Sequence, residues 1–126
     1  MSSSHSNKDR AVAFLETIIS GEVSKAYAEH VAPGFRHHNP YFKGDAASLL
    51  AGMEESEAQS PGKQFEVQRA LEGGDFVAVH SRLRMSPSHP DMAVVHIFRF
   101  KDDRITEFWD IAQMAPDPVV NENGLF

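Results

Sequence analysis

The first part of the chain has apolar residues spaced three and four positions apart. Between residues 11 and 19 they fall at Ala11, Phe14, Leu15, Ile18 and Ile19. This spacing lays one apolar stripe along a helix. Ser6 or Asn7 can cap the first turn of this helix, and Gly21 can end it in a left-handed conformation.

Two further helices are predicted before residue 62. The second has one apolar face, made of Val23, Ala26, Tyr27, His30 and Val31. It ends by Pro33 and Gly34, because proline has no amide hydrogen and disfavours a helical residue before it. The third begins at the capping residue Asp45 and stops before Pro61. Its buried side carries Leu49, Leu50 and Met53.

After residue 62 the period of the pattern changes from 3.6 to 2. Four strand-like segments follow, "KQFEVQRALEG", "DFVAVHSRLRM", "MAVVHIFRF" and "RITEFWDIAQM". The short connections between them predict an antiparallel meander. Helices followed by strands indicate an α+β domain with its helices on one face of the sheet. We expect a single domain over residues 1–126, with a loose N-terminus at 1–6 and a C-terminal tail at 114–126.

Several of these strands are apolar on both faces. Val77 and Val79 alternate with Phe76 and Ala78, for example. A sheet with one solvent-exposed face would instead have polar residues on that face. One face should cover the helices and a pocket, and a second copy of the chain is the simplest cover for the other face. A homodimer through the sheet is therefore expected.

Composition narrows the chemistry. The formal net charge of −6 gives no basic surface for a phosphate backbone, so nucleic acid is not expected as a partner. No apolar run is long enough to span a membrane, and the first residues lack the apolar stretch of a secretory signal, so a cytoplasmic location is expected. The absence of cysteine leaves histidine and carboxylates as the strong bases or ligands.

Strand register predicts which polar side chains meet. If Asp102 and Asp103 form a two-residue hairpin tip, His96 lies opposite Trp109 and both project from one face. Asp110 then points the other way unless a bulge intervenes. The same face would also hold Val94, Phe98, Ile111 and Gln113.

The same reasoning predicts which way three other histidines point. A pairing of Arg84 with Met92, one register among several, would set His80 across from His96. His37 and His38 are adjacent in an extended segment, so they must point to opposite faces. We expect His38 to face the pocket and His37 to point outward.

Structural roles are the simpler interpretation for the remaining candidates. His5, His30 and His89 are expected to be ordinary surface or packing residues. A metal site is not favoured, because the chain has no HExxH helix and no His-x-His spacing. The sequence signal for a nucleophilic serine at Ser81 or Ser86 is weaker still, since neither residue lies in a strained strand-to-helix turn.

Four stretches, "HHNPYFKG", "VAVHSRL", "AVVHIFRFKDDRITEFWDIAQ" and "NENGLF", resemble the SnoaL-like polyketide cyclase family of the nuclear transport factor two-like superfamily. The resemblance implies a cone-shaped α+β fold, with a curved antiparallel sheet of about four to six strands wrapped around three N-terminal helices. It also implies a deep apolar cavity, dimers through the sheet, and cofactor-free acid/base chemistry such as an aldol condensation that closes a polyketide ring.

The resemblance also points to individual residues. His38 matches the family's histidine before Asn-Pro, His80 matches its strand histidine, and Trp109, Asp110 and Gln113 match the end of its last strand. His96 departs from the pattern, since relatives often have Asp before "IFRF", and His37 stands where they often have Gln.

The expected function is that of a cofactor-independent general acid/base enzyme acting on a small apolar carbonyl compound, without metal. His96 or Asp110 would remove a proton beside the carbonyl, and His80 or His38 would stabilise the enolate oxygen. The substrate would be bound by Asn39, Phe98, Trp109 and Gln113. Two alternatives stay open: a binding protein that holds a small apolar ligand without turnover, and an interaction module whose pocket is filled by side chains such as Leu49.

Overall fold

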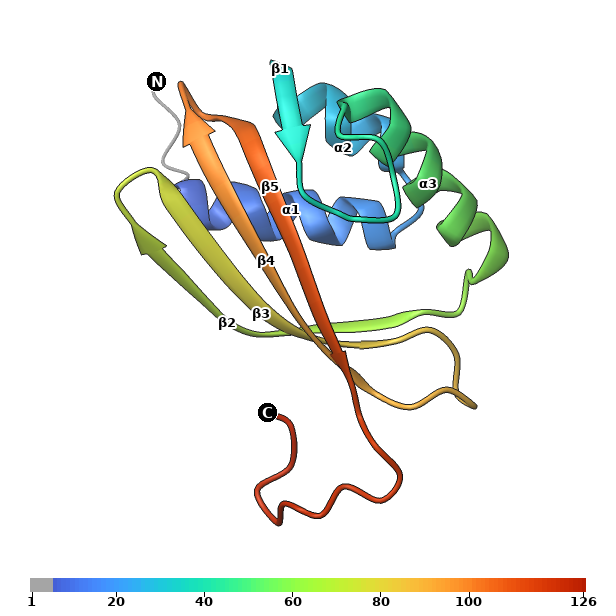
Figure 1. Cartoon of the computed structure of the whole chain (residues 1–126). Coiled ribbons are helices and arrows are strands. Elements are labelled where there is room, and N and C mark those ends of the chain that lie inside the picture. Colours follow the sequence, from blue (N-terminus) through green and yellow to red (C-terminus); the bar gives the residue numbers. More distant parts are fainter. Residues whose placement is uncertain (1–5) are drawn as a thin grey trace.

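The computed structural model describes residues 6–126, which form three helices and five strands (Figure 1). In chain order these are α1 (Asn7–Ile19), α2 (Val23–His30), β1 (Val31–His37), α3 (Ala46–Gln59), β2 (Gln64–Gly73), β3 (Phe76–Arg84), β4 (Met92–Lys101) and β5 (Arg104–Met114). Most of the expected loose N-terminus, with His5, lies outside the described residues. Ser6, which we had included in it, is instead the N-cap of α1.

Helix boundaries follow the capping residues. The Ser6 side chain accepts a hydrogen bond from the Asp9 amide at 3.1 Å, and the Asp9 carboxylate accepts one from the Ser6 amide. This reciprocal pair satisfies two amides that the first turn of a helix leaves free. Gly21 follows α1 with a φ of 97°, and Asp45 caps α3 through the Ser48 amide. The caps predicted at Ser6, Gly21 and Asp45 are confirmed.

The sheet has the strand order β1-β5-β4-β3-β2. Strands β2 to β5 form the predicted antiparallel meander, whereas β1 lies parallel to β5 and was not predicted. The second helix was expected to continue to Val31, but it ends at His30, and Val31 is already extended. Pro33 disfavours a helical residue before it, so the chain turns extended early and reaches the free edge of β5.

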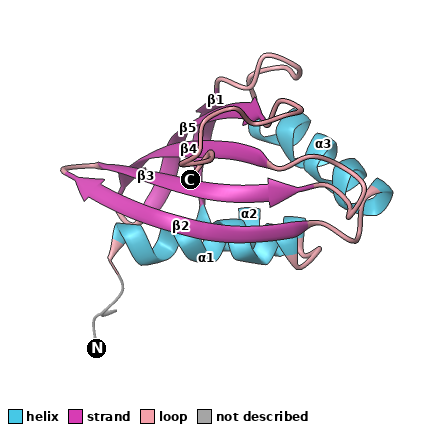
Figure 2. Cartoon of the chain, turned by 90° about the horizontal axis from the view of Figure 1, so that it is seen from below, coloured by secondary structure: helices cyan, strands magenta, loops and turns pink. Residues whose placement is uncertain are grey.

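The three helices lie on one side of the curved sheet; β4 and β5 pass across α1 in Figure 1, and β2 runs along α1 when seen from below (Figure 2). Phe14 of α1 is at the centre of the core. Its ring lies 5.9 Å from that of Phe98 on β4 and 6.3 Å from that of Phe108 on β5. Leu49 of α3 is also fully buried. The inner face of the sheet is therefore the one that covers the helices.

The β4–β5 hairpin contains a bulge that decides the facing of β5. Asp102 and Asp103 form the tip with positive φ angles of 51° and 66°, and Lys101 pairs with Arg104 as predicted. The register then shifts, because Arg99 pairs with Glu107 and Thr106 is the extra residue. A slip of one residue moves every following side chain to the other face.

The consequence of this bulge is that the predicted pairing of His96 with Trp109 was wrong. His96 pairs with Asp110, and Trp109 pairs with Ile97. Asp110 therefore shares the inner face with His96, in the way that a bulge was expected to bring about. Trp109, and with it Ile111 and Gln113, lies on the outer face.

The β3–β4 register also differs from the one we counted. Leu83 rather than Arg84 pairs with Met92, so His80 pairs with Val95 and lies on the outer face. The connecting loop is fixed by Asp91, which accepts hydrogen bonds from Arg82 at 2.5 Å and from Arg84 at 2.8 Å. This side-chain anchor sets the register, and the pattern of apolar residues could not reveal it.

Candidate active site

An open cleft of about 400 Å³ lies on the inner face of the sheet. Strands β3, β4 and β5 form its floor, and the 38–44 loop that follows β1 forms one wall. The residues that line it are Asn39, Pro40, Tyr41, Leu83, Met92, Val94, His96, Asp110 and Ala112. Its polar groups are few and lie close together, which is typical of a small-molecule site.

His96 and Asp110 are neighbours across the β4–β5 ladder and both face this cleft. His96 Nε2 lies 3.6 Å from Asp110 Oδ1, and the other carboxylate oxygen accepts a hydrogen bond of 3.1 Å from the side-chain amide of Asn39. The His96 ring stacks on Phe108 at a centroid distance of 5.4 Å. Packing and hydrogen bonding thus hold the two groups in fixed orientations.

Burial sets the protonation state of His96. It lowers the pKa of the imidazole, and the nearby Asp110 carboxylate opposes the shift without cancelling it. The ring is therefore neutral near pH 7. Its Nδ1 atom is enclosed and has no hydrogen-bond partner within residues 6–126. Nε2 is consequently the nitrogen that can reach a ligand in the cleft.

Tyr27 is a third titratable group in this region. Burial raises the pKa of its phenol well above the ordinary value, and the Asp110 carboxylate raises it further. The hydroxyl stays protonated and donates to the Met53 sulfur at 3.3 Å. Tyr27 therefore adds no charge beside Asp110.

A second, smaller cavity of about 110 Å³, which we call the deep cavity because it extends between the sheet and helices α1 and α3, adjoins the cleft. Its walls are mostly apolar, and they include Leu15, Ile18, Ile19, Met53, Phe65, Leu83 and His96. Its polar wall is made of Ser56, Glu57 and Lys63. His96 and Leu83 line both spaces, so this cavity and the cleft adjoin at these two residues.

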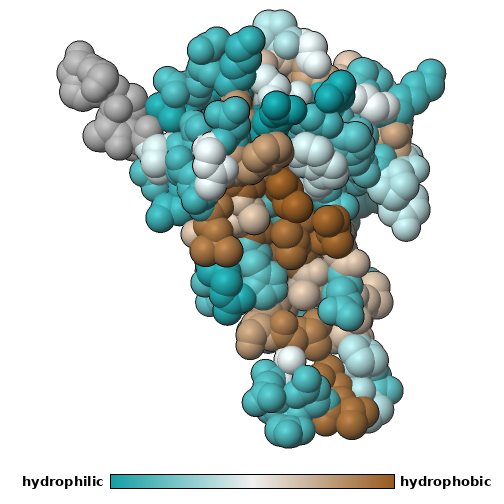
Figure 3. Space-filling model, turned by 60° about the vertical axis from the view of Figure 1, so that its left-hand side comes forward, coloured by the Kyte–Doolittle hydropathy of each residue, from teal (hydrophilic) through white to brown (hydrophobic). Residues whose placement is uncertain are grey.

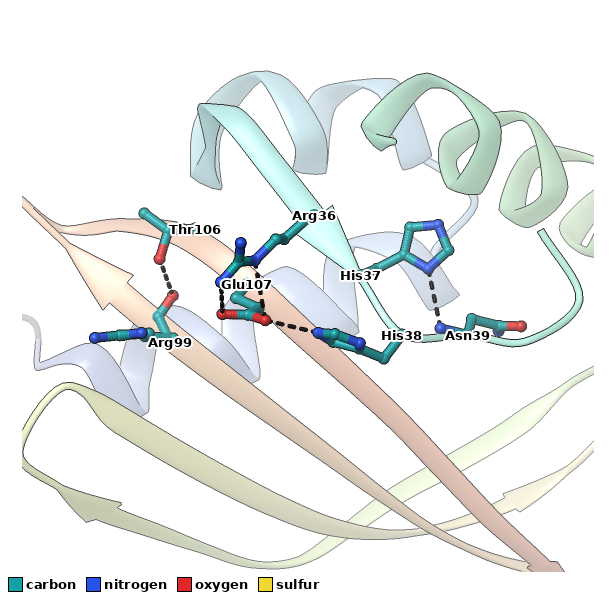
Figure 4. A network of polar contacts seen from close by, with 7 residues as sticks. All are labelled: Arg36, His37, His38, Asn39, Arg99, Thr106 and Glu107. Atoms are coloured by element: carbon teal, nitrogen blue, oxygen red, sulfur yellow. Dashed lines mark hydrogen bonds and ion pairs between the residues drawn. The ribbon is translucent and has the colours of Figure 1, made fainter. Parts of the chain in front are cut away.

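His38 lies on the outer side of the sheet, contrary to the prediction. Its Nε2 contacts a Glu107 carboxylate oxygen at 2.6 Å (Figure 4). Its ring also stacks on that of Trp109 at a centroid distance of 5.0 Å. Arg36 contacts the same carboxylate at 3.1 Å. The hydrogen bonds from His38 and Arg36 lower the pKa of Glu107. This group is an ion-pair cluster on the far side from the cleft.

His37 is the inward-facing member of the pair and is buried, so the predicted orientation of the two histidines was reversed. Its Nδ1 accepts a hydrogen bond from the backbone amide of Asn39 at 3.0 Å, and its Nε2 donates to the backbone carbonyl of Lys43 at 2.5 Å. It therefore bridges both ends of the 38–44 loop. The reversal follows from β1, because its pairing with β5 places Phe35 and His37 on the inner face.

The other expected site residues lie elsewhere. His80 contacts the Arg69 side chain on the outer face, and its ring lies 5.9 Å from that of Phe126. Trp109 and Gln113 are also on the outer face, and Phe98 is fully buried in the core. The structure therefore brings together Asn39, His96 and Asp110 in the cleft.

The sequence reasoning missed Lys63 and Glu57. They stand in a polar stretch around a Pro-Gly turn, which is typical of a solvated surface. Their side chains are nevertheless only 8% and 10% exposed. Nothing in the local sequence pattern reveals this burial.

Two kinds of site can be assessed within residues 6–126. No group of three or more His, Asp or Glu side chains in this range is arranged to hold a metal ion. No helix in the same range is long and apolar enough to cross a membrane.

A curved sheet wrapped over three helices, with His96 and Asp110 facing an open cleft, defines a small cone-shaped α+β protein. The model of the SnoaL-like domain matches residues 11–108, and the chain belongs to this family. The resemblance stated from sequence and the expected fold class are thereby confirmed. Among curated proteins none matches.

Solved structures agree with this assignment. IdmH from Streptomyces antibioticus, described as a proposed polyketide cyclase, is 25% identical with a TM-score of 0.71, over 86% of this chain and 93% of its own. A proposed polyketide cyclase from Acidithiobacillus ferrooxidans is 21% identical with a TM-score of 0.70, over 90% and 92% of the two chains. An NTF2-like protein of unknown function from Cytophaga hutchinsonii is 15% identical with a TM-score of 0.72, over 96% and 100%. The last two establish the fold alone.

Proposed function

We propose that this protein is a cofactor-independent acid/base enzyme that enolises a small apolar carbonyl compound, in a reaction of the aldol or isomerase type. The observation that carries the proposal is the His96–Asp110 pair, with 3.6 Å between Nε2 and Oδ1 on the floor of an apolar cleft. This separation is longer than a hydrogen bond, so each group remains free to contact a different atom of a substrate.

In the proposed step Asp110 is the base. Its carboxylate takes a proton from the carbon beside the carbonyl, and the electrons of that C–H bond form the enolate. Neutral His96 donates its Nε2–H to the developing oxygen anion, because Nδ1 is enclosed. The enolate carbon then attacks a second carbonyl or takes a proton back at another position. Asp110 returns its proton in either case, so no external reactant is needed.

Asn39 is a positioning residue in this proposal. Its amide holds one oxygen of Asp110 at 3.1 Å and leaves the other facing His96. Its own backbone is held by His37. The apolar walls favour proton transfer, since low polarity strengthens the electrostatic interactions of the enolate with His96.

The experiment measures hydrogen–deuterium exchange at the carbon beside the carbonyl of 1-tetralone by NMR in D₂O. Asp110→Asn and His96→Gln should each slow the enzyme-dependent exchange by about 100-fold or more. His38→Gln and His80→Gln are matched controls on the outer face, and they should retain the exchange rate. Unchanged exchange in both cleft variants would reject the assignment.

A second candidate function is binding of an apolar ligand without turnover. It is favoured by the hydrogen bond from the Asn39 side chain, which occupies one of the two carboxylate oxygens of Asp110. Native mass spectrometry of the purified protein would reveal a retained ligand. A ligand that leaves chemically unchanged, together with absent exchange activity, would support this candidate.

We also propose that the chain forms a homodimer through the outer face of the sheet. Leu71, Ala78, Ile97 and Trp109 form one continuous row across β2, β3, β4 and β5. Leu71 is 64% exposed and Ile111 is 55% exposed. Figure 3 shows apolar side chains gathered on one face of the molecule. An apolar surface of this kind is typical of a face that another protein covers.

A further inference from the structure

The deep cavity has a charged group at its polar wall that the proposed reaction does not use. Lys63 Nζ lies 2.6 Å from Glu57 Oε2 and donates to the Ser56 hydroxyl oxygen at 2.7 Å. Both charged side chains are about nine-tenths buried. Buried ion pairs carry a large desolvation cost and are weak contributors to stability, so this pair needs another explanation.

Two hydrogen-bond donors of this group are unused. An ammonium has three N–H donors, and Lys63 uses two of them on Ser56 and Glu57. The Ser56 hydroxyl accepts from Lys63, and within residues 6–126 its own hydrogen has no acceptor. Both residues line the deep cavity. Lys63 and Ser56 therefore offer a pair of donors to a ligand oxygen in an otherwise apolar space.

Charge and size restrict the ligand. Glu57 already neutralises Lys63, so a carboxylate in the cavity would be a second buried negative charge without a partner. A neutral carbonyl or hydroxyl oxygen carries no such cost. The volume of about 110 Å³ is less than the roughly 150 Å³ of a cavity that holds benzene. It therefore fits a short arm rather than a ring.

We propose that the Lys63–Ser56 donor pair binds a neutral oxygen on a short arm of the substrate, while the body of the substrate occupies the cleft. The arm passes His96 and Leu83, which line both spaces. This inference rests on the proposed function for the choice of a carbonyl compound. It makes Lys63 and Ser56 specificity residues for a two-ended molecule, with one oxygen at His96 and another in the deep cavity.

The test uses three probes of matched shape: 1-(2-naphthyl)propan-2-one, 2-isobutylnaphthalene and 2-naphthylacetate. Their arms end in a ketone, a hydrocarbon and a carboxylate. The protein is labelled with ¹³C in its methionine methyl groups, because Met53 lines the deep cavity and Met92 lines the cleft. The ketone should shift both methyl signals, whereas naphthalene alone should shift that of Met92.

The deciding variant is Lys63→Met with Glu57→Gln, which removes the donors without leaving an unpaired charge. It should weaken binding of the ketone about tenfold and change binding of the hydrocarbon less than twofold. Ser56→Ala should weaken only the ketone, by about threefold. The matched control is Lys25→Met with Glu22→Gln, since this is an exposed Lys–Glu pair at 3.9 Å. It should bind all three probes normally.

Three outcomes would overturn the inference: an unmoved Met53 signal with the ketone, an equal loss for ketone and hydrocarbon, or tighter binding of the carboxylate than of the ketone. Circular dichroism checks folding of the double variant, and Ser56→Ala gives an independent measurement if that variant does not fold. Binding is measured in H₂O and requires no turnover. A failure here with tetralone exchange intact therefore rejects the deep-cavity site alone, and absent exchange with intact ketone binding rejects only the enzyme.

Discussion

A single imidazole, that of His96, connects the stability of this protein with its proposed chemistry. It is held neutral by burial, between the Phe108 ring and the Asp110 carboxylate. At low pH the unfolded chain therefore binds a proton at this histidine that the folded chain does not bind, which lowers the free energy of unfolding. A neutral imidazole also has one N–H, and the enclosure of Nδ1 directs it toward the ligand at Nε2.

A pH dependence of stability follows from this. Burial lowers the pKa of His96 and also that of His30, whereas both titrate near 6.5 in the unfolded chain. As the pH falls below about 6.5, the unfolded state binds more protons, so the free energy of unfolding should fall. The slope due to each histidine is at most about 1.4 kcal/mol per pH unit and ends at its folded pKa.

Urea unfolding between pH 5 and pH 7 measures this effect. His96→Gln should flatten the dependence, and His30→Gln should remove much of the remainder. The lowered pKa values of Glu107 and Asp91 act at more acidic pH, because carboxylates in the unfolded chain titrate near 4. An identical slope in His96→Gln and in the unsubstituted chain would contradict the assignment of a neutral buried imidazole.

Among the elements, the β4–β5 hairpin has the greatest influence on the site. Its tip places two non-glycine residues, Asp102 and Asp103, at positive φ. This conformation favours glycine at the second position of a two-residue turn. Asp103→Gly should therefore raise the free energy of unfolding by about 0.5–1 kcal/mol in urea titrations.

The control for this prediction concerns Arg10, whose guanidinium lies 3.3 Å from Asp103. Loss of an exposed pair costs little, and Arg10→Met measures that cost separately. If Asp103→Gly also lowers the free energy of unfolding in the Arg10→Met background, the positive φ of Asp103 does not destabilise the hairpin tip, and the prediction is contradicted.

The hairpin also shows what the sequence could and could not reveal. The stripe of Phe14 and Ile18 and the alternation along β3 to β5 predicted helices and strands, because burial on one side is written in the local period. The extra residue at Thr106 has no such signature. It exchanged the facing of Trp109 and Asp110, so the fold was predictable while half of the site was misplaced.

Long-range pairing explains the other errors. Within the sheet, strand β1 pairs only with β5, about seventy positions further along the chain, and this parallel partner leaves no local pattern. Without β1, the facing of His37 and His38 was a choice between two equal alternatives. The buried Lys63–Glu57 pair likewise lines a cavity together with residues of α1, β3 and β4, which are distant in the sequence.

At the scale of the whole molecule, the proposed dimer depends on the outer face of the sheet. Leu71 and Ile111 are its most exposed apolar residues in strands β2 and β5, apart from Met114 at the strand end. Leu71→Glu combined with Ile111→Glu should convert the proposed dimer to a monomer, because a charge buried in an interface has no partner. Light scattering coupled to gel filtration measures the mass.

A matched control places glutamate at Val120, which is 85% exposed in the C-terminal segment. Val120→Glu should leave the mass unchanged. A monomer for the unsubstituted chain at micromolar concentration would refute the dimer, and it would leave the cleft on the inner face unaffected.

The 38–44 loop, which forms one wall of the cleft, contacts helix α3 at a glycine, Gly52. A Cβ atom at Gly52 would lie 2.4 Å from the Phe42 ring. Alanine suits a helix interior better than glycine does, so helix formation alone does not explain the residue. A methyl group at position 52 would displace the Phe42 ring and disturb the loop that carries Asn39, so this glycine shapes the wall of the cleft although it does not line the cleft itself.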